Sequence, residues 1–280
     1  MSVDVLYCEG GSKSPDARTI RAILIGLTCT VESMGSKYGF GQKVLLSRNA
    51  RPNSTIAGLR DRDLVRDDSE PTNTPCEWRI ESDKVWLGWH WERVEIENYL
   101  IDPVVVQHAL GPRIPDAEAY RAALRASAET IADYTAARIA LSISRVRFSP
   151  LENSWGTERG ADRHKFPDQR GEADCRKAIS EVVKQYVQNQ IVPESIVLQE
   201  FDMLLTSCRP GGKRHKHFIT FFSGKDLLCG MDGALASLGF KSPFEFRERI
   251  LKGIEDSSED VWTWLSEWTQ LRRLVMASPS

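Results

Sequence analysis

Short apolar runs alternate with amphipathic segments over the first sixty residues. The run at 3–8 has strand length and stops at Glu9-Gly10. Ser14-Pro15 then marks a helix start, with the serine as N-cap and the proline at the first helical position. Apolar residues continue from there at helical spacing, at Ala17, Ile20, Ile23, Leu24 and Leu27. This pattern predicts a strand followed by a helix.

Three further apolar runs predict strands at 43–47, 55–60 and 84–90. The polar, proline-containing segment 66–78 is typical of a loop, and Asp102-Pro103 is typical of a helix start. Strands and helices in this order favour an α/β fold with a mostly parallel sheet.

Beyond residue 115 the sequence turns strongly helical. The segment 116–144 is rich in alanine, and further helices are expected at 172–190, 193–206, 243–254 and 258–276. The polar, Gly- and Pro-rich stretch 149–171 predicts a long loop or flap. We expect Trp262, Trp264 and Trp268 to form a packing face near the C-terminus.

Composition limits the class of protein. Hydrophobic residues make up 41% and charged residues 27% of the 280, and 37 Lys and Arg stand against 39 Asp and Glu, so the chain is a folded protein without a globally basic surface. No apolar run reaches the ~20 residues that cross a bilayer, and no signal peptide is visible, so we expect a cytoplasmic protein without a membrane anchor. The six scattered cysteines predict reduced, mostly buried thiols.

Three acidic residues follow predicted strands. Glu9 ends the first strand, and Asp61 and Asp63 follow the strand at 55–60. The carboxyl ends of neighbouring parallel strands meet at one edge of a sheet, and a period of two puts Asp61 and Asp63 on one side if the strand continues. Carboxylates gathered there repel one another unless a cation neutralises them, which predicts a Mg²⁺ or Mn²⁺ site. The alternative is a solvated turn whose acids pair with neighbouring arginines.

Four segments in this order resemble a known family. They are Tyr7-Cys8-Glu9-Gly10, Asp61-Arg62-Asp63, the Glu-Ile-Glu-Asn-Tyr-Leu of 95–100, and Ser223-Gly224-Lys225. Together they are similar to the Toprim domain of topoisomerases, primases and OLD-type nucleases. The last two resemble the stand-alone bacterial Toprim nucleases, a group that includes the nuclease subunit of the PARIS anti-phage system.

The resemblance implies a Toprim-like core over 1–112, a helical region over 113–207, a return to the core over 208–230 that carries Lys225, and C-terminal helices over 231–280. It implies that Glu9 handles a proton or binds metal and that Lys225 contacts the scissile phosphate. The family's second acid falls at Lys13, so either Asp16 takes that role or one ligand is lost. The implied metal ligands are Glu9, Asp61, Asp63, Glu97, Glu95 and Asp16.

The implied activity is metal-dependent hydrolysis of phosphodiester bonds in DNA or RNA, including structured RNA such as tRNA. The resemblance implies a toxic effector of antiviral defence. It also implies an ABC-type ATPase as partner, because this sequence has no Walker A motif. The sequence leaves open whether the chain forms homo-oligomers.

A basic segment at 209–217 is a second candidate for contact with nucleic acid. Its members are Arg209, Lys213, Arg214, His215 and Lys216. The flap residues Trp155, Arg159, Arg163, His164 and Lys165 are further candidates, since aromatic rings stack on bases. The alternative for the basic segment is a plain solvated loop.

Two other functions compete with the nuclease. One is a Toprim-like module that binds nucleic acid or an ATPase without cutting. The other is a glycosyltransferase that uses Asp61-x-Asp63 to hold a metal and a nucleotide sugar, and such an enzyme has no need of Glu9 or Lys225.

Overall fold

The computed structural model divides the chain into two compact units, each described by itself below. The sheet unit comprises Met1–Arg62, Pro71–Ile114 and Arg247–Ser280, and the helical unit comprises Asp63–Glu70 and Pro115–Phe246. The structure describes residues 2–35, 39–80, 84–111, 116–147, 167, 169–184 and 193–277. The predicted flap residues, from Trp155 to Lys165, lie outside this part of the chain.

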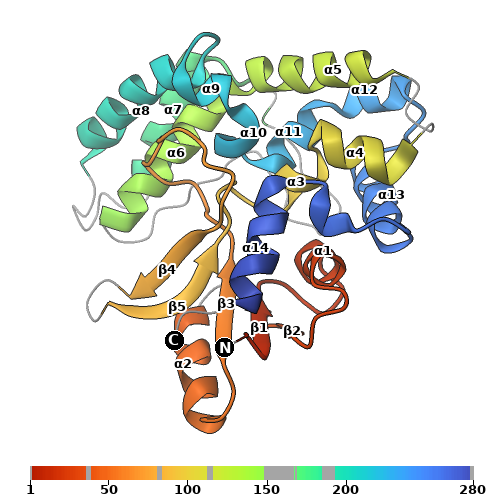
Figure 1. Ribbon diagram of the computed structural model, residues 1–280. Helices are drawn as coiled ribbons and strands as arrows, with labels where there is room; N and C mark the ends of the chain where they lie inside the picture. The colour runs from red at the N-terminus through yellow and green to blue at the C-terminus, as the bar shows by residue number, and fades with distance from the viewer. Residues whose placement is uncertain are drawn as a thin grey trace. The chain divides into compact units, whose positions relative to one another are not determined.

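A five-stranded sheet forms the centre of the sheet unit (Figure 1). Its strands stand in the order β2-β1-β3-β5-β4, and all neighbouring pairs are parallel except β4 with β5. Their bounds are Val5–Cys8 (β1), Thr30–Ser33 (β2), Ile56–Arg60 (β3), Cys76–Ile80 (β4) and Val85–His90 (β5). The predicted α/β class with a mostly parallel sheet is therefore confirmed.

The strand predicted at 43–47 was wrong, because this segment belongs to helix α2 (Phe40–Ala50). Phe40 and Val44, one helical turn apart, are buried on the sheet, whereas Leu46 is 65% exposed. The apolar run therefore has helical rather than strand periodicity in its burial. The second strand is instead β2, which is short, lies at the edge of the sheet and carries no apolar run.

Gly58 and Gly88 face each other where β3 pairs with β5. A Cβ atom on Gly88 would lie 2.0 Å from the carbonyl oxygen of Gly58, and one on Gly58 would lie 2.8 Å from the Trp78 ring. Both positions therefore require glycine, and the pair lets the two strands and the covering Trp78 pack closely.

Besides α2, five α-helices belong to the described part of the sheet unit. They are α1 (Pro15–Ile23), α3 (Glu97–Leu100), α4 (Pro103–Leu110), most of α13 (Pro243–Glu255) and α14 (Ser266–Met276). Ser14 caps α1 and Asp102 caps α4, and a proline follows each cap, as predicted. The short η3 (Val261–Thr263) precedes α14. Trp264 and Trp268 are buried, which confirms the predicted packing role for these two residues.

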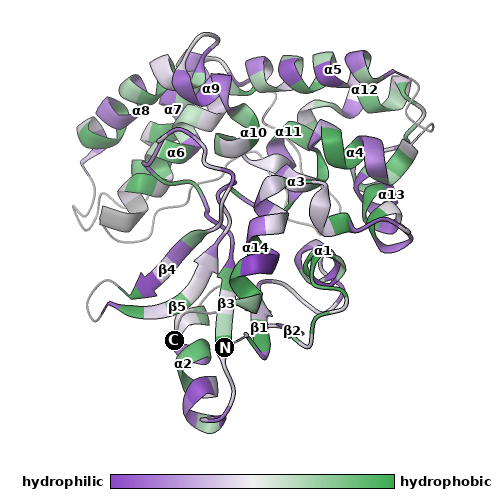
Figure 2. Ribbon diagram, in the orientation of Figure 1, coloured by the Kyte–Doolittle hydropathy of each residue, from purple (hydrophilic) through white to green (hydrophobic). Residues whose placement is uncertain are grey.

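The helical unit contains amphipathic helices that bury one side each. Green and purple residues are interleaved along α5 and α8 in Figure 2, and α6 packs against both α7 and α8. The helices are α5 (Ala117–Thr130), α6 (Ala132–Arg147), α7 (Glu172–Lys184), α8 (Glu194–Cys208), α9 (Lys213–Lys216), α10 (Phe218–Phe221), α11 (Gly224–Gly230) and α12 (Asp232–Ser237).

The unit boundaries differ from the expected domains at two places. Residues 208–230, expected to return to the sheet core, belong to the helical unit, where α9 packs on α8 and α11 packs on α5. The C-terminal helix α14 belongs to the sheet unit, where the Val3 N–H donates to the Val275 carbonyl at 2.8 Å. No helix in the described ranges is both long and apolar enough to span a bilayer.

Candidate functional site

Glu9 and Asp61 meet at the carboxyl ends of β1 and β3. The parallel register places Cys8 opposite Leu59, so both acids leave the sheet at the same edge. The backbone N–H of Asp61 donates a hydrogen bond to Glu9 Oε1 at 3.3 Å. The structure therefore brings together two of the acids singled out from the sequence, although 52 residues separate them.

Asp16 approaches the same edge from the first turn of α1. Gly10 has φ of 76°, and the position of its absent Cβ lies 2.6 Å from Ser14 Oγ and 3.8 Å from Asp16 Oδ2. Ser14 Oγ donates to the Glu9 carbonyl at 3.4 Å and accepts from the Ala17 N–H at 3.3 Å. The turn after β1 thus folds tightly against the start of α1, and this brings Asp16 beside the Glu9-Gly10 turn.

The Cys8 thiol reports the combined charge of these acids. The pKa of the Cys8 thiol is raised to about 12, mainly by burial. The negative charges of Asp16, Glu9 and Asp61 contribute to this rise, and the positive charge of Arg21 opposes it. Three carboxylates from three segments therefore act on one fully buried sulfur atom.

Asp63 departs from the expected geometry. Strand β3 ends at Arg60, and Asp63 has φ of 61°, so the extended conformation does not continue through Asp61-Arg62-Asp63. The condition on which Asp61 and Asp63 were expected to share one side, a continuing strand, is therefore not met. Aspartate is among the residues that tolerate this left-handed conformation, which gives the residue a backbone role. Its role as a metal ligand stays a prediction.

Glu95 and Glu97 lie in a bend and in the short helix α3, and not on a strand. Glu97 is 2% exposed, and its Oε1 lies 3.3 Å from Arg247 Nη1. Glu95 is half-buried, and its N–H donates to Asn98 Oδ1 at 3.1 Å. The alternative of an amphipathic strand with both acids in water is wrong, because Glu97 is buried and bound to an arginine.

The donors at the edge of the sheet are chemically suited to a hard divalent cation. Among the residues that the structure describes, no three His, Cys, Asp or Glu side chains are placed to hold one ion. Mg²⁺ usually takes only one or two carboxylates and completes its octahedron with water and substrate phosphate. Glu9 and Asp61, with Asp16 nearby, fit that smaller donor set.

Lys225 lies in the first turn of α11, in the helical unit, and its side chain is exposed. Ser223 caps this helix by accepting from the Asp226 N–H at 3.3 Å, and the buried Asp226 carboxylate pairs with Arg138. The Ser-Gly-Lys-Asp segment is thus a firmly anchored helix start that presents its lysine to solvent. Contact between Lys225 and a phosphate stays a prediction.

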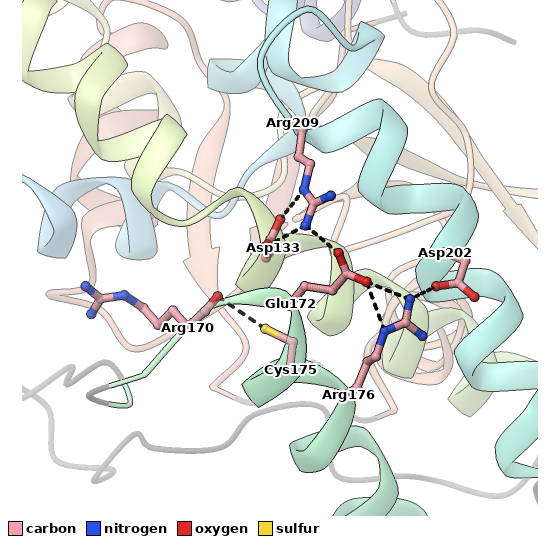
Figure 3. A network of polar contacts seen from close by, with 7 residues as sticks. All are labelled: Asp133, Arg170, Glu172, Cys175, Arg176, Asp202 and Arg209. Atoms are coloured by element: carbon pink, nitrogen blue, oxygen red, sulfur yellow. Dashed lines mark hydrogen bonds and ion pairs between the residues drawn. The ribbon is translucent and has the colours of Figure 1, made fainter.

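Arg209, at the start of the basic segment, is bound by acids of its own unit (Figure 3). Its Nε and Nη2 atoms lie 2.7 and 2.9 Å from the two Asp133 carboxylate oxygens, and Nη2 lies 2.9 Å from Glu172 Oε2. Arg209, and then Arg176, hold the pKa of Glu172 below its usual value. A surface pocket of about 440 Å³ adjoins this network, lined by Thr130, Asp133, Arg170 and Arg209 among others.

The rest of the basic segment divides into buried and exposed members. Arg214 is 2% exposed and donates to backbone carbonyls, so its predicted contact with nucleic acid is wrong for this structure. Lys213 lies 3.8 Å from Asp68, and the His215 ring packs near Phe222. Lys216 is exposed, and its contact with nucleic acid stays a prediction.

One buried polar cluster was missed by sequence reasoning. Tyr99 Oη donates to Glu267 Oε2 at 2.6 Å, and the Glu92 N–H donates to Glu267 Oε1 at 2.7 Å. Burial raises the pKa of Glu267 to about 7. The sequence offers one sign of this cluster, a glutamate between tryptophans in an amphipathic helix. Its partners Tyr99 and Glu92 lie 168 and 175 residues earlier in the chain, so the sequence does not identify them.

No protein-family model matches the chain, and no curated protein matches its sequence significantly.

Proposed function

We propose that this protein is a divalent-metal-dependent nuclease that hydrolyses phosphodiester bonds. The observation that carries the proposal is the hydrogen bond from the Asp61 N–H to Glu9 Oε1, which joins the carboxyl ends of β1 and β3. Ligand sites of open parallel sheets lie at this edge. Asp16 lies beside the same turn and is a candidate for a role other than that of a ligand, because Glu9 and Asp61 already supply the one or two carboxylates that Mg²⁺ usually takes.

Each acid has a distinct part in the proposed reaction. Glu9 and Asp61 would hold Mg²⁺ or Mn²⁺, and the Asp61 N–H orients the Glu9 carboxylate. Asp16, held in the first turn of α1, accepts the proton of the attacking water. When bound, the cation supplies charge stabilisation at the phosphate and lowers the pKa of a bound water. Lys225 is proposed to contact the scissile phosphate.

The substrate is proposed to be DNA or RNA, with structured RNA such as tRNA included. The role as a toxic effector in antiviral defence and the ABC-type ATPase partner depend on the motif resemblance alone. Cleavage tests on plasmid, single-stranded DNA and total RNA distinguish the substrate classes.

The glycosyltransferase alternative requires Asp61 and Asp63 to hold a metal together. The backbone conformation at Asp63 counts against it, because the two residues do not lie on one extended strand. The module that binds without cutting remains the second candidate, because Glu97 already has a cationic partner in Arg247. It predicts that nucleic acid binds equally well with EDTA present.

The test compares the wild-type protein with Glu9→Gln and Asp61→Asn in Mg²⁺, Mn²⁺ and EDTA. Glu32→Gln is the matched control, because Glu32 is a partly exposed acid on the neighbouring strand β2. We expect cation-dependent cleavage by the wild type and the control. Since loss of an outer-shell partner already costs ~10–100-fold, loss of a ligand is expected to cost at least ~100-fold.

Equal cleavage by the wild type and Glu9→Gln would overturn the nuclease proposal. EDTA-resistant binding of nucleic acid without any cleavage would favour the binding module. The thermal midpoint of each variant distinguishes a lost ligand from a lost fold, because removing one of several like charges is expected to leave stability unchanged or raised.

A further inference from the structure

The peptide group that joins Arg60 to Asp61 is held at both ends. Its N–H donates to Glu9 Oε1 at 3.3 Å, and its carbonyl oxygen accepts a hydrogen bond from the Trp91 N–H at 3.0 Å. Because a peptide group is planar, the bond at the carbonyl also sets the direction in which the N–H points. Trp91, which directly follows β5, therefore helps to aim the Asp61 N–H at Glu9.

Arg62 anchors the chain on the other side of Asp61. Its side chain is buried, and Nη1 donates to the Glu92 carbonyl at 2.8 Å. Burying a guanidinium is costly unless hydrogen bonds compensate it, and bonds from a charged donor are stronger than neutral ones. Both neighbours of Asp61 are thus bound to two consecutive residues, 91 and 92, called the support segment below. All of these residues lie in the sheet unit.

The support segment is itself firmly held. The Glu92 N–H donates to Glu267 Oε1 at 2.7 Å. The Glu92 carboxylate accepts from the Thr72 hydroxyl and from the Asn73 N–H, both at 2.7 Å. Trp91 and Glu92 are both buried. A residue bound through its N–H, its carbonyl and its side chain has little freedom to shift, so the Glu92 carbonyl is a fixed acceptor for the neighbouring arginine.

We infer that Arg62 is a positioning residue, which holds Asp61 in line with Glu9 through its bond to the Glu92 carbonyl. The inference rests on the proposed function. Misplacement of a reacting group by ~1 Å can reduce the rate by ~100-fold, and Arg62 directly follows a proposed metal ligand. Arg62 thus acts through the backbone of Asp61 rather than on the phosphate.

The test uses Arg62→Lys and Glu92→Gln. Lysine keeps the positive charge but loses the planar donor set, and the Glu92 change loosens the acceptor without removing any cation. Arg48→Lys is the matched control, because Arg48 donates to the carbonyls of Ile56 and Trp86 at 2.8 and 2.6 Å, near the opposite ends of β3 and β5.

The measurements are kcat and KM for cleavage, the Mg²⁺ concentration at half-maximal activity, and hydrogen exchange of the Asp61 amide. We expect Arg62→Lys to lower kcat ~10-fold, to raise the half-saturating Mg²⁺ concentration and to speed exchange of this amide, with KM unchanged. Glu92→Gln is expected to change the same quantities in the same direction by ~2–3-fold, since it weakens the bonds of one carboxylate. Arg48→Lys is expected to lower the thermal midpoint and to leave kcat at the wild-type value.

Unchanged kcat in folded Arg62→Lys would overturn the inference. An equal fall of kcat in Arg48→Lys would do the same, because it would indicate a general loosening of the sheet. A raised KM with kcat unchanged would also overturn it, because Arg62 would then contact the phosphate. If Arg62→Lys does not fold, Glu92→Gln against Arg48→Lys decides.

Failure of the nuclease proposal is distinguishable from failure of this inference. If the wild type binds Mg²⁺ without cleaving, the nuclease proposal fails on its own, and calorimetric Mg²⁺ affinities of the same variants decide whether Arg62 positions Asp61. A wild type that neither binds Mg²⁺ nor cleaves overturns both.

Discussion

The two charge-rich regions of the protein are built in opposite ways. At the carboxyl ends of β1 and β3, the charges of Asp16, Glu9 and Asp61 act on the buried Cys8 thiol, and the charge of Arg21 opposes them. In the basic segment of the helical unit, Arg209 and Lys213 lie against acids, and Arg214 is bound by carbonyl groups. The sequence alone marked both regions as candidate functional sites, because each is rich in charged residues.

The comparison separates charge used for structure from charge available for chemistry. An arginine with two carboxylate partners or three carbonyl partners organises its own unit. Acidic side chains that converge at the carboxyl ends of neighbouring strands are instead typical of a site that binds a ligand. The three predictions below test that distinction, from the largest expected effect on free energy to the smallest.

Glu267 tests whether a buried acid outside the sheet edge is structural. Its pKa of about 7 lies above the usual 4.5, mainly because of burial, while Tyr99, the Glu92 N–H and Arg93 favour the charged form and the Glu92 charge opposes it. Between these two pKa values the folded state holds a proton that the unfolded state releases. Stability is therefore greatest below pH ~4.5 and is lost as pH rises through 7.

We expect Glu267→Gln to remove this pH dependence, because the amide retains a carbonyl oxygen for the Glu92 N–H. The wild type should lose on the order of 3 kcal/mol relative to the variant between pH 5 and pH 8, measured by denaturant unfolding. The exposed Glu77→Gln is the control. Parallel pH profiles of wild type and Glu267→Gln would contradict the prediction.

Asp63 tests whether its charge or its backbone conformation matters. Gly and Asn tolerate φ near 60°, whereas Ala does not do so readily. We therefore expect Asp63→Gly and Asp63→Asn to cleave nucleic acid nearly as well as the wild type. Asp63→Ala is expected to be destabilised by about 1 kcal/mol and to lose activity.

Cleavage rates and unfolding free energies of the three Asp63 variants give the answer together. Loss of activity in Asp63→Gly and Asp63→Asn, with stability preserved, would instead establish Asp63 as a ligand and place it in the acidic group.

Lys216 gives the smallest expected effect. It is exposed on α9, where Lys213 pairs with Asp68 and Arg214 donates to backbone carbonyls. We expect Lys216→Gln to weaken binding to nucleic acid by ~2–3-fold at low salt and to reduce the salt dependence by about one ion. Arg209→Met is expected instead to lower the thermal midpoint. A larger effect of Arg209→Met on binding than on stability would break the comparison.

The sequence predicted the features that depend on local signals. Ser14-Pro15 and Asp102-Pro103 start helices because cap and proline act within one turn. The runs at 3–8, 55–60 and 84–90 became β1, β3 and β5, and their parallel pairing brought Glu9 to Asp61.

The features that sequence missed depend on distant partners. Residues 43–47 have the apolar pattern of a strand. They are helical in the structure because Phe40 and Val44, one helical turn apart, are buried against the sheet. The carbonyl groups that bind Arg214 lie about 150 residues earlier in the chain, where no side-chain pattern marks them. The spacing of Asp61 and Asp63 likewise does not predict the positive φ of Asp63.

The two adjacent glycines after β1 differ in a way that is useful for spectroscopy. Gly10 has no room for a side chain, whereas the Cβ position of Gly11 has no neighbouring atom within 4 Å. A fluorescent label attached through Gly11→Cys would therefore sit on the loop that joins Glu9 to Asp16 without displacing it. The fluorescence emission of such a label would change when a cation binds to the carboxylates, so cation binding could be measured before any nucleic acid is added.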